Sequence, residues 1–342
     1  PGAERGVPLS VSRLETFAEC GMKSFLTAQL GLREHERPED SRGIDASERG
    51  RRVHEILEVF GVKSAEAGLL PWRPKGTPRH RELLEDSIGE VIERVLRSAP
   101  ASQRNLWEAE RLRYSGLLRR WLRGETSELA DPDWMPIEFE WEFEGQRIEL
   151  EDGGAPLWYR GRVDRVDLAT SQGGTRTVRI VDYKTGSSRD YYDDVTDSGR
   201  NLQLYLYGIA AERKFGAATS AGTYDFVFSG SRSFWSGTCE HRKPSAAKPK
   251  ETAHTALRQV AALVNGMEAG HFAPIPRAKG KPDDGPCTFC SMAEACGPWR
   301  SEILAARELD DPVGMGLLDA LENPDLPGPL PEVTAKANGG TL

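Results

Sequence analysis

The sequence predicts an α/β fold in which a helical N-terminal lobe precedes a mixed central sheet flanked by helices, and cysteines clasp a C-terminal segment. Three observations predict this fold. Helical periodicity dominates residues 9–125, strand patterns fill residues 137–184, and three of the five cysteines lie between residues 287 and 296. With 342 residues, the chain can bury one large core or two small ones.

Each element follows from its own spacing of apolar residues and turn signals. Helices are expected over Ser12–Leu30, Ser47–Phe60, Arg81–Leu96 and Gln103–Leu122. Strands are expected over Ile137–Leu150, 157–168 and 176–184. The next expected elements are a helix over Asn201–Phe215, a hairpin of Thr223–Ser229 and Ser233–Cys239, and a helix over Thr252–Met267. Beyond Arg300 we expect another helix and then a disordered Pro/Gly-rich tail over Pro324–Leu342.

These elements divide the chain into four expected parts: a helical lobe over residues 1–125, a sheet-based core over 126–270, a cysteine segment over 271–300, and a terminal helix with its tail over 301–342. The net charge of −8 excludes a bulk polycation, so any contact with nucleic acid depends on local basic surface. No signal peptide and no apolar run of membrane length are visible, so we expect a cytoplasmic protein without a membrane partner. The opening Pro1-Gly2-Ala3 suggests a piece of a longer protein.

The run from Ile180 to Gly186 places an acid and a lysine two residues apart at the end of a strand. Side chains alternate along a strand, so Asp182 and Lys184 share one face while Tyr183 points to the other. An acid can bind a divalent cation, and a lysine can steady a water or the charge that grows on a phosphate. The spacing alone leaves open a second interpretation, a surface ion pair of small energetic value.

A second acid, Asp164, lies on the preceding expected strand. The turn at Gly173–Gly174 joins the two strands in a hairpin, which brings Asp164 near Asp182. A metal ion needs oxygen ligands that converge from different segments, and this pair meets that need. The alternative is a solvated ladder of charges along the hairpin, made of Arg162, Asp164, Arg165 and Asp167.

Two expected helices add polar candidates whose individual signals are weak. Gln203 and Tyr207 are four residues apart, so they share one helical face. His54 sits beside the apolar stripe of an earlier helix, where a lone histidine is more often a structural residue than a ligand.

Together these candidates occur in the order seen in RecB-like nucleases of the PD-(D/E)XK superfamily: His54, Asp164, Asp182-x-Lys184 and Gln203-x3-Tyr207. The strings Gly-Arg-Val-Asp-Arg-Val-Asp at 161–167 and Val-Asp-Tyr-Lys-Thr-Gly at 181–186 are similar to that family's two central strands. The resemblance runs from about Leu9 to Arg300. It implies a restriction-endonuclease-like fold with residues 126–270 as the nuclease core.

The resemblance also implies roles for these residues. The implied ligands of Mg²⁺ or Mn²⁺ are His54, Asp164, Asp182 and the main-chain carbonyl of Tyr183. Lys184 would orient the attacking water and neutralise charge in the transition state. Gln203 and Tyr207 would position the DNA strand or the lysine, and Tyr207 is also expected to offer a stacking platform for an unpaired base.

The cysteine pattern predicts a second metal site. Five cysteines, an odd number, indicate a reducing compartment in which thiols act as ligands. Cys287, Cys290 and Cys296 leave a tetrahedral site one ligand short, and Cys20 is the natural fourth. Their spacing alone does not separate zinc from an iron–sulfur cluster. Cys239 matches no motif and is expected to be a free, partly buried thiol.

One cysteine before the core and three after it resembles the iron–sulfur-containing branch of the same family. That branch includes AddB-type subunits of bacterial helicase–nucleases and the CRISPR-adaptation nucleases. The resemblance implies a [4Fe-4S] cluster on these four cysteines, with Zn²⁺ as the alternative. Gly21 departs from the proline that relatives usually carry there. A helicase is the implied partner, fused or associated, because this sequence has no visible nucleotide-binding motor motif.

The implied function is therefore metal-dependent hydrolysis of DNA in repair or recombination, by an exonuclease that acts on single-stranded DNA or DNA ends. Two alternatives belong to other classes. One is a catalytically idle DNA-end-binding or scaffold module of a helicase–nuclease complex. The other is a zinc-stabilised nucleic-acid-binding protein in which the carboxylates are incidental. The intact set of His54, Asp164, Asp182 and Lys184 favours the enzyme.

Overall fold

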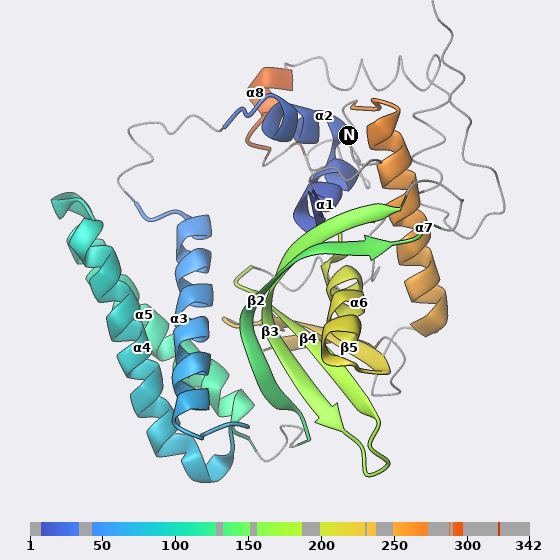
Figure 1. The fold of residues 1–342 in the computed structure, drawn as a ribbon. Helices are drawn as coiled ribbons and strands as arrows, with labels where there is room; N and C mark the ends of the chain where they lie inside the picture. The colour runs from blue at the N-terminus through green and yellow to red at the C-terminus, as the bar shows by residue number, and fades with distance from the viewer. Residues whose placement is uncertain are drawn as a thin grey trace, which may run out of the picture.

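The computed structural model describes residues 8–33, 43–127, 133–150, 156–186, 199–229, 231–236, 249–272, 287, 290–296 and 321, without side chains at 219, 231–236 and 249–254. It shows a central sheet with helices on both faces (Figure 1). Cys239, the tail over Pro324–Leu342 and all of the stretch after Arg300 except Leu321 lie outside the described residues. None of the described helices is long and apolar enough to cross a membrane.

The sheet is mixed, as the sequence predicts. Its strands are β1 (Leu9–Ser10), β2 (Met135–Ile148), β3 (Leu157–Thr170), β4 (Arg176–Lys184), β5 (Thr219–Phe226) and β6 (Ser231–Ser236). The order is β1-β3-β4-β5-β6, and β2 pairs with β3 beside this path. The expected hairpins β3–β4 and β5–β6 are antiparallel, whereas β4–β5 and β1–β3 are parallel. The two-residue strand β1 is too short to give a sequence signal.

Helices surround the sheet and extend one side into a lobe. They are α1 (Val11–Glu19), α2 (Gly21–Ser24), α3 (Ala46–Glu66), α4 (Thr77–Ser98), α5 (Ala101–Glu125), α6 (Gln203–Phe215), α7 (Pro249–Glu268) and α8 (Ala293–Cys296). Short π and 3₁₀ turns are η1 (Phe25–Gln29) and η3 (Pro74–Gly76). The expectation of one helix over Ser12–Leu30 is wrong, because Cys20 is extended (φ −165°, ψ 116°) and its sulfur caps α2.

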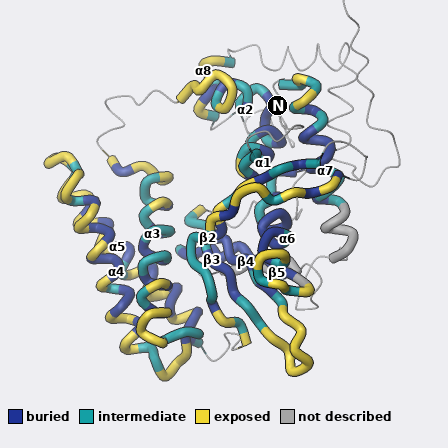
Figure 2. The backbone as a smooth tube through the Cα atoms, viewed as in Figure 1, coloured by how far each residue is buried: buried dark blue, intermediate teal, exposed yellow. Residues whose placement is uncertain are grey.

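Alternation along β4 gives the sheet two buried faces. Ile180 belongs to the core that α1, α6 and α7 cover, whereas Val181 and Tyr183 belong to the core formed with α3, α4 and α5. Figure 2 shows both cores as buried segments on the strands and on the inner sides of the helices. Asp182 and Lys184 have the parity of Ile180, so their side chains leave the sheet on the face that α6 covers.

Buried charges join the helical lobe to the sheet. Arg165 is 2% exposed and Asp167 is 0% exposed, so the alternative interpretation of a solvated ladder is wrong for these two residues. The Arg165 guanidinium donates to Glu125 on α5 at 3.0 Å. The Trp121 indole on the same helix donates to Asp225 on β5 at 3.1 Å. Paired in this way, the charges tolerate burial at the interface between α5 and the sheet.

Candidate active site

The β3–β4 hairpin brings the two predicted acids together. The register pairs Arg165 with Val181, so Asp164 and Asp182 are the next residues across the hairpin. One Asp164 oxygen, Oδ2, accepts the main-chain N–H of Tyr183 at 2.6 Å. Burial and then the charge of Asp182 raise the pKa of Asp164 to about 6. Two buried carboxylates that repel each other favour a cation between them.

The lobe contributes His54 from α3. A Cβ at Gly61 would lie 2.3 Å from the Phe139 ring, so glycine permits α3 to approach β2 closely. Two turns before Gly61, His54 Nδ1 lies 3.2 Å from Asp164 Oδ1 and 3.7 Å from Glu140 Oε1. His54, Glu140 and Asp164 form a group of possible metal ligands: within the described residues, their ligand atoms all lie within 4.8 Å of one another. His54, which the family resemblance implies as a ligand, thus lies beside the acids.

The protonation of His54 follows from these neighbours. Burial alone lowers the pKa of the imidazole, but the hydrogen bonds to Asp164 and Glu140 outweigh it and raise the pKa to about 10. A divalent cation requires a neutral imidazole, so cation binding at this site would release that proton.

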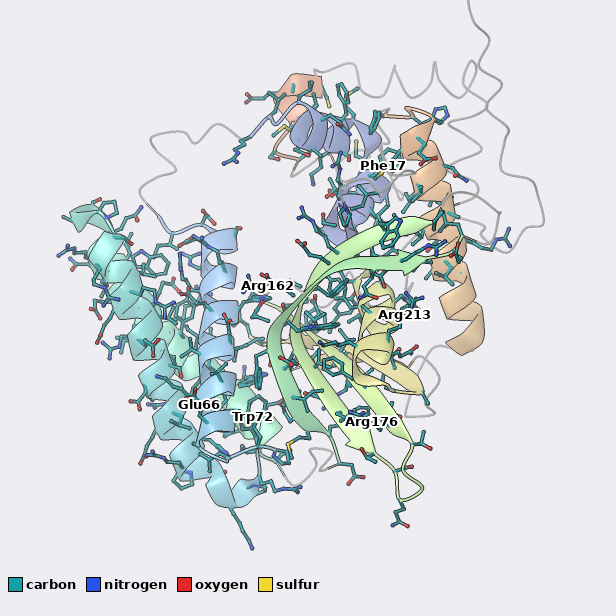
Figure 3. All side chains as sticks on the ribbon, in the orientation of Figure 1. Phe17, Glu66, Trp72, Arg162, Arg176 and Arg213 are labelled. Carbon is teal, nitrogen blue, oxygen red and sulfur yellow. The ribbon has the colours of Figure 1, made fainter. Side chains whose placement is uncertain are left out.

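Glu140 on β2 is a candidate ligand that sequence reasoning missed. It is the non-glycine residue with positive φ (49°) in the described chain, and such strain gathers at functional sites. Arg162 holds the Glu140 carboxylate and also reaches Glu58 at 3.8 Å and Glu142 at 3.5 Å, so it spans α3 and β2 (Figure 3). The sequence alternates acids along β2, and nothing in that alternation distinguishes Glu140 from its neighbours.

Lys184 is held by the groups around it. Its ammonium lies 2.6 Å from Asp182 Oδ2, donates to Gln203 Oε1 at 3.3 Å, and sits 5.2 Å from the centroid of the Tyr224 ring. The side chains of Lys184 and Asp182 are only 23% and 11% exposed, which does not fit a solvated surface pair. The predicted partnership of Gln203 with Lys184 is therefore present as a contact.

The Tyr207 side chain packs in the core between α6 and the sheet, and the residue is 6% exposed. A Cβ at Gly161 would lie 2.3 Å from the Tyr207 ring, which fills the space above β3 and meets Phe143 edge-on. Burial, then the charge of Asp182, raises the pKa of its hydroxyl, so the phenol stays neutral. The expectation that Tyr207 offers a stacking platform to a base is wrong, because the ring is buried within the protein.

Glu15 on α1 is the second residue that sequence reasoning missed. Its Oε1 accepts the main-chain N–H groups of Leu202 at 2.8 Å and Gln203 at 3.1 Å. Burial raises the pKa of Glu15 to about 7, against the opposing hydrogen bonds and the charge of Lys184. A contact between residues 187 positions apart leaves no mark in the spacing of a single sequence.

Three of the predicted cysteine ligands lie in one short segment. The Cys290 N–H donates to the Cys287 carbonyl at 3.4 Å, and the Cys296 N–H donates to the Met292 carbonyl at 3.2 Å at the end of α8. Within the described part of the chain, these three cysteines and Cys20 form no disulfide bond. No three of their sulfurs come within 4.8 Å of one another among the residues that the structure describes.

Cys20 lies between α1 and α2, where its buried Sγ accepts the Lys23 N–H at 3.5 Å. Phe272, on the path from α7 to the cysteine segment, packs against Phe17 and Phe25, which flank Cys20 in sequence, with centroids 5.6 and 5.5 Å apart. Figure 1 draws α2 and α8 at the same end of the molecule. This placement agrees with a shared site, and the thiol chemistry of the set fits either zinc or iron.

Comparison with known proteins gives one family. The sequence profile of the PD-(D/E)XK nuclease superfamily matches residues 8–297. A protein from Alkaliphilus metalliredigens, named as a subunit of an ATP-dependent helicase/deoxyribonuclease, is 31% identical over 205 residues, an alignment that covers 58% of this chain and 17% of that protein. Proteins of the same name from Pelotomaculum thermopropionicum and Symbiobacterium thermophilum are each 32% identical, over 59% of this chain and 17% of their own length. The chain thus spans less than a fifth of these relatives.

Proposed function

Because the chain belongs to the PD-(D/E)XK nuclease superfamily, we propose that it hydrolyses DNA in a reaction that depends on Mg²⁺ or Mn²⁺. The observation that carries this proposal is the convergence of four residues at the end of the β3–β4 hairpin: His54, Asp164, Asp182 and Lys184. Two carboxylates, an imidazole and an ammonium in one place are the groups that metal-assisted phosphodiester hydrolysis needs.

We assign the metal ligands from this geometry. The proposed set is His54, Glu140, Asp164, Asp182 and the main-chain carbonyl of Tyr183. A cation bound there would polarise a phosphate oxygen and lower the pKa of a water. Oxygen ligands with one imidazole suit Mg²⁺ or Mn²⁺.

The protein side chains then act on the water and the phosphate. The Lys184 ammonium lies 2.6 Å from Asp182 Oδ2, where it can donate to the attacking water or to the charge that grows on the phosphate. The Gln203 side-chain oxygen accepts a hydrogen bond from the Lys184 ammonium and so limits the directions in which the ammonium points. Tyr207 has a supporting role, because its ring packs against β3, the strand that carries Asp164.

The proposed substrate and partner are inferred from the relatives. Their name joins a helicase to a deoxyribonuclease, and this chain matches a small part of their length. We propose that the chain digests the DNA strand or DNA end that an associated or fused helicase delivers, in repair or recombination. The idle scaffold alternative is disfavoured, because such a module has no need for the Asp182–Lys184 contact of 2.6 Å.

We also propose that Cys20, Cys287, Cys290 and Cys296 bind one [4Fe-4S] cluster. Four thiolates suit either zinc or an iron–sulfur cluster. The observation that favours the cluster is the arrangement of one cysteine before the nuclease core and three after it, which resembles the iron–sulfur-containing branch of the family.

End-labelled single-stranded and double-stranded DNA, incubated with the protein and Mg²⁺ or Mn²⁺, tests the proposed activity. We expect shortened products with either ion and none with a chelator. Asp182→Asn, which removes a ligand charge and changes volume little, should remove the products. Intact DNA with both ions and both substrates would contradict the proposed activity.

A further inference from the structure

The first turn of α6 lies against the candidate active site and takes its cap from another helix. The first N–H groups of a helix have no partner inside the helix. Leu202 is the N-cap of α6 and has no side-chain oxygen to accept them. Glu15, on α1, accepts the N–H groups of both Leu202 and Gln203 with a single oxygen, at 2.8 and 3.1 Å. A carboxylate at this point is also favoured by the helix dipole.

The same turn of α6 carries the partner of the lysine. The main-chain N–H of Gln203 donates to Glu15 Oε1, and its side-chain oxygen accepts a hydrogen bond from Lys184 Nζ at 3.3 Å. The ammonium continues the chain of contacts to Asp182 at 2.6 Å. Few bonds separate the capped N–H from the amide oxygen that contacts the lysine, so movement of this turn displaces Gln203.

We propose that Glu15 is a positioning residue for the nuclease reaction: it fixes the first turn of α6 and, through Gln203, the direction of the Lys184 ammonium. The inference rests on the proposed function and adds a residue that does not itself touch DNA or metal. Glu15 belongs to no group of three ligating side chains within 4.8 Å of one another in the described part of the chain. Its Oε1 is already engaged by two N–H donors, which separates its role from that of the metal ligands.

Two conservative variants separate the effect of side-chain length at position 15 from the effect of its charge. Glu15→Gln keeps the length and an acceptor oxygen but removes the charge, whereas Glu15→Asp keeps the charge and shortens the side chain by one methylene. We expect Glu15→Gln to cleave within about twofold of the wild-type kcat. Glu15→Asp should lower kcat by roughly tenfold or more with KM for DNA nearly unchanged, because a displaced group slows chemistry without weakening binding. Mn²⁺ affinity by calorimetry should be unchanged in both.

Glu19→Gln is the matched control, one turn further along α1. Glu19 pairs with Lys23 at 2.7 Å and has no contact with α6 among the described interactions, so kcat should stay at the wild-type value. A double-mutant cycle with Gln203→Ala supplies the second test. If Glu15 acts through Gln203, Glu15→Asp should cost less than about twofold once Gln203 is replaced.

The outcomes are distinct. Glu15→Asp at the full wild-type rate, or Glu15→Gln as slow as Glu15→Asp, overturns the positioning role. A loss of Mn²⁺ affinity in either variant also overturns it, because Glu15 would then be a metal ligand. An equal loss of kcat from Glu15→Asp with and without Gln203→Ala overturns it as well. If the wild-type protein itself leaves DNA intact, both the proposed function and the positioning role of Glu15 are overturned. An active wild type with a fully active Glu15→Asp overturns the inference alone.

Discussion

Lys184 has neighbours of three kinds: the Asp182 carboxylate, the Gln203 amide oxygen and the face of the Tyr224 ring. Each of them favours the charged ammonium, and together they leave it few orientations. A donor held in place before the reaction stabilises developing charge without the cost of reorganising it. The pair of Asp182 and Lys184 is thus more than the surface ion pair that its spacing allows.

Lys184→Ala should lower kcat roughly 100- to 1000-fold while DNA affinity changes little, because the ammonium acts on charge that develops in the transition state. Single-turnover cleavage and fluorescence anisotropy measure the two effects separately. Lys214→Ala, at the exposed last turn of α6, is the control and should cleave normally. A Lys184→Ala protein that cuts near the wild-type rate would show that the reactive centre is elsewhere.

Glu140 combines a strained backbone with a carboxylate near His54 and Asp164. Glu140→Gln should weaken Mn²⁺ binding by at least roughly tenfold, because an amide is a poorer cation ligand than a carboxylate. Isothermal calorimetry measures the loss. Glu142→Gln is the matched control, because Glu142 also contacts Arg162 but its side chain is 72% exposed. It should leave Mn²⁺ affinity unchanged. Equal Mn²⁺ affinities in the two variants would remove Glu140 from the ligand set.

At the scale of elements, the contact between α5 and the sheet depends on a buried acid. Burial raises the pKa of Asp225 to about 6, although Arg165 and the Trp121 indole oppose the change. An unfolded aspartate titrates near 4. Between about pH 4 and pH 6 the folded protein therefore holds more protons, and this group's contribution to stability is lost as the pH rises through that window.

Asp225→Asn keeps an acceptor for Trp121 and does not titrate. The melting temperature of the variant relative to the wild type should therefore rise from pH 4 to pH 7, as the wild type loses this contribution. Thermal unfolding across that range gives the comparison. Asp86→Asn, exposed on α4, serves as the control and should show a constant difference. A constant difference for Asp225→Asn as well would contradict the raised pKa.

The elements were largely predictable, because their signals are local. Periodicity predicts α3, α4, α5, α6 and α7, and the Gly-containing turns predict the β3–β4 and β5–β6 hairpins. Two features depended on tertiary contacts. The helix break at Cys20 comes from a sulfur cap, and β1 exists only because β3 offers it a parallel edge.

The site was predictable only in part. The order of His54, Asp164, Asp182, Lys184 and Gln203 carried a family resemblance, and their convergence agrees with it. Glu15 and Glu140 were missed for a physical reason. Each acts through contacts between segments distant in sequence, and acids on helices and strands are common on solvated faces.

For the whole molecule, the proposed cysteine clasp joins the first described helices to the segment after α7. Closing so long a loop removes freedom from the unfolded chain, so binding of the cluster becomes folding free energy. The cluster is therefore expected to stabilise the fold rather than take part in hydrolysis.

Cys20→Ser and Cys290→Ser should each give a colourless protein that melts about 10 °C lower and binds DNA less well as a consequence. Visible absorbance, iron content and thermal unfolding follow the change. Cys239→Ser should keep the colour, the iron and the melting temperature. A Cys20→Ser protein with full iron content and unchanged stability would place the fourth ligand elsewhere, with Cys239 the first candidate.

One cation site at the end of the β3–β4 hairpin is central to the proposed reaction. Crystals soaked in Mn²⁺ test it directly through the anomalous difference map. We expect one peak within about 2.5 Å of carboxylate oxygens from Asp164 and Asp182, with His54, Glu140 and the Tyr183 carbonyl completing the coordination. A protein that cleaves DNA but shows its Mn²⁺ peak away from both aspartates would contradict the account.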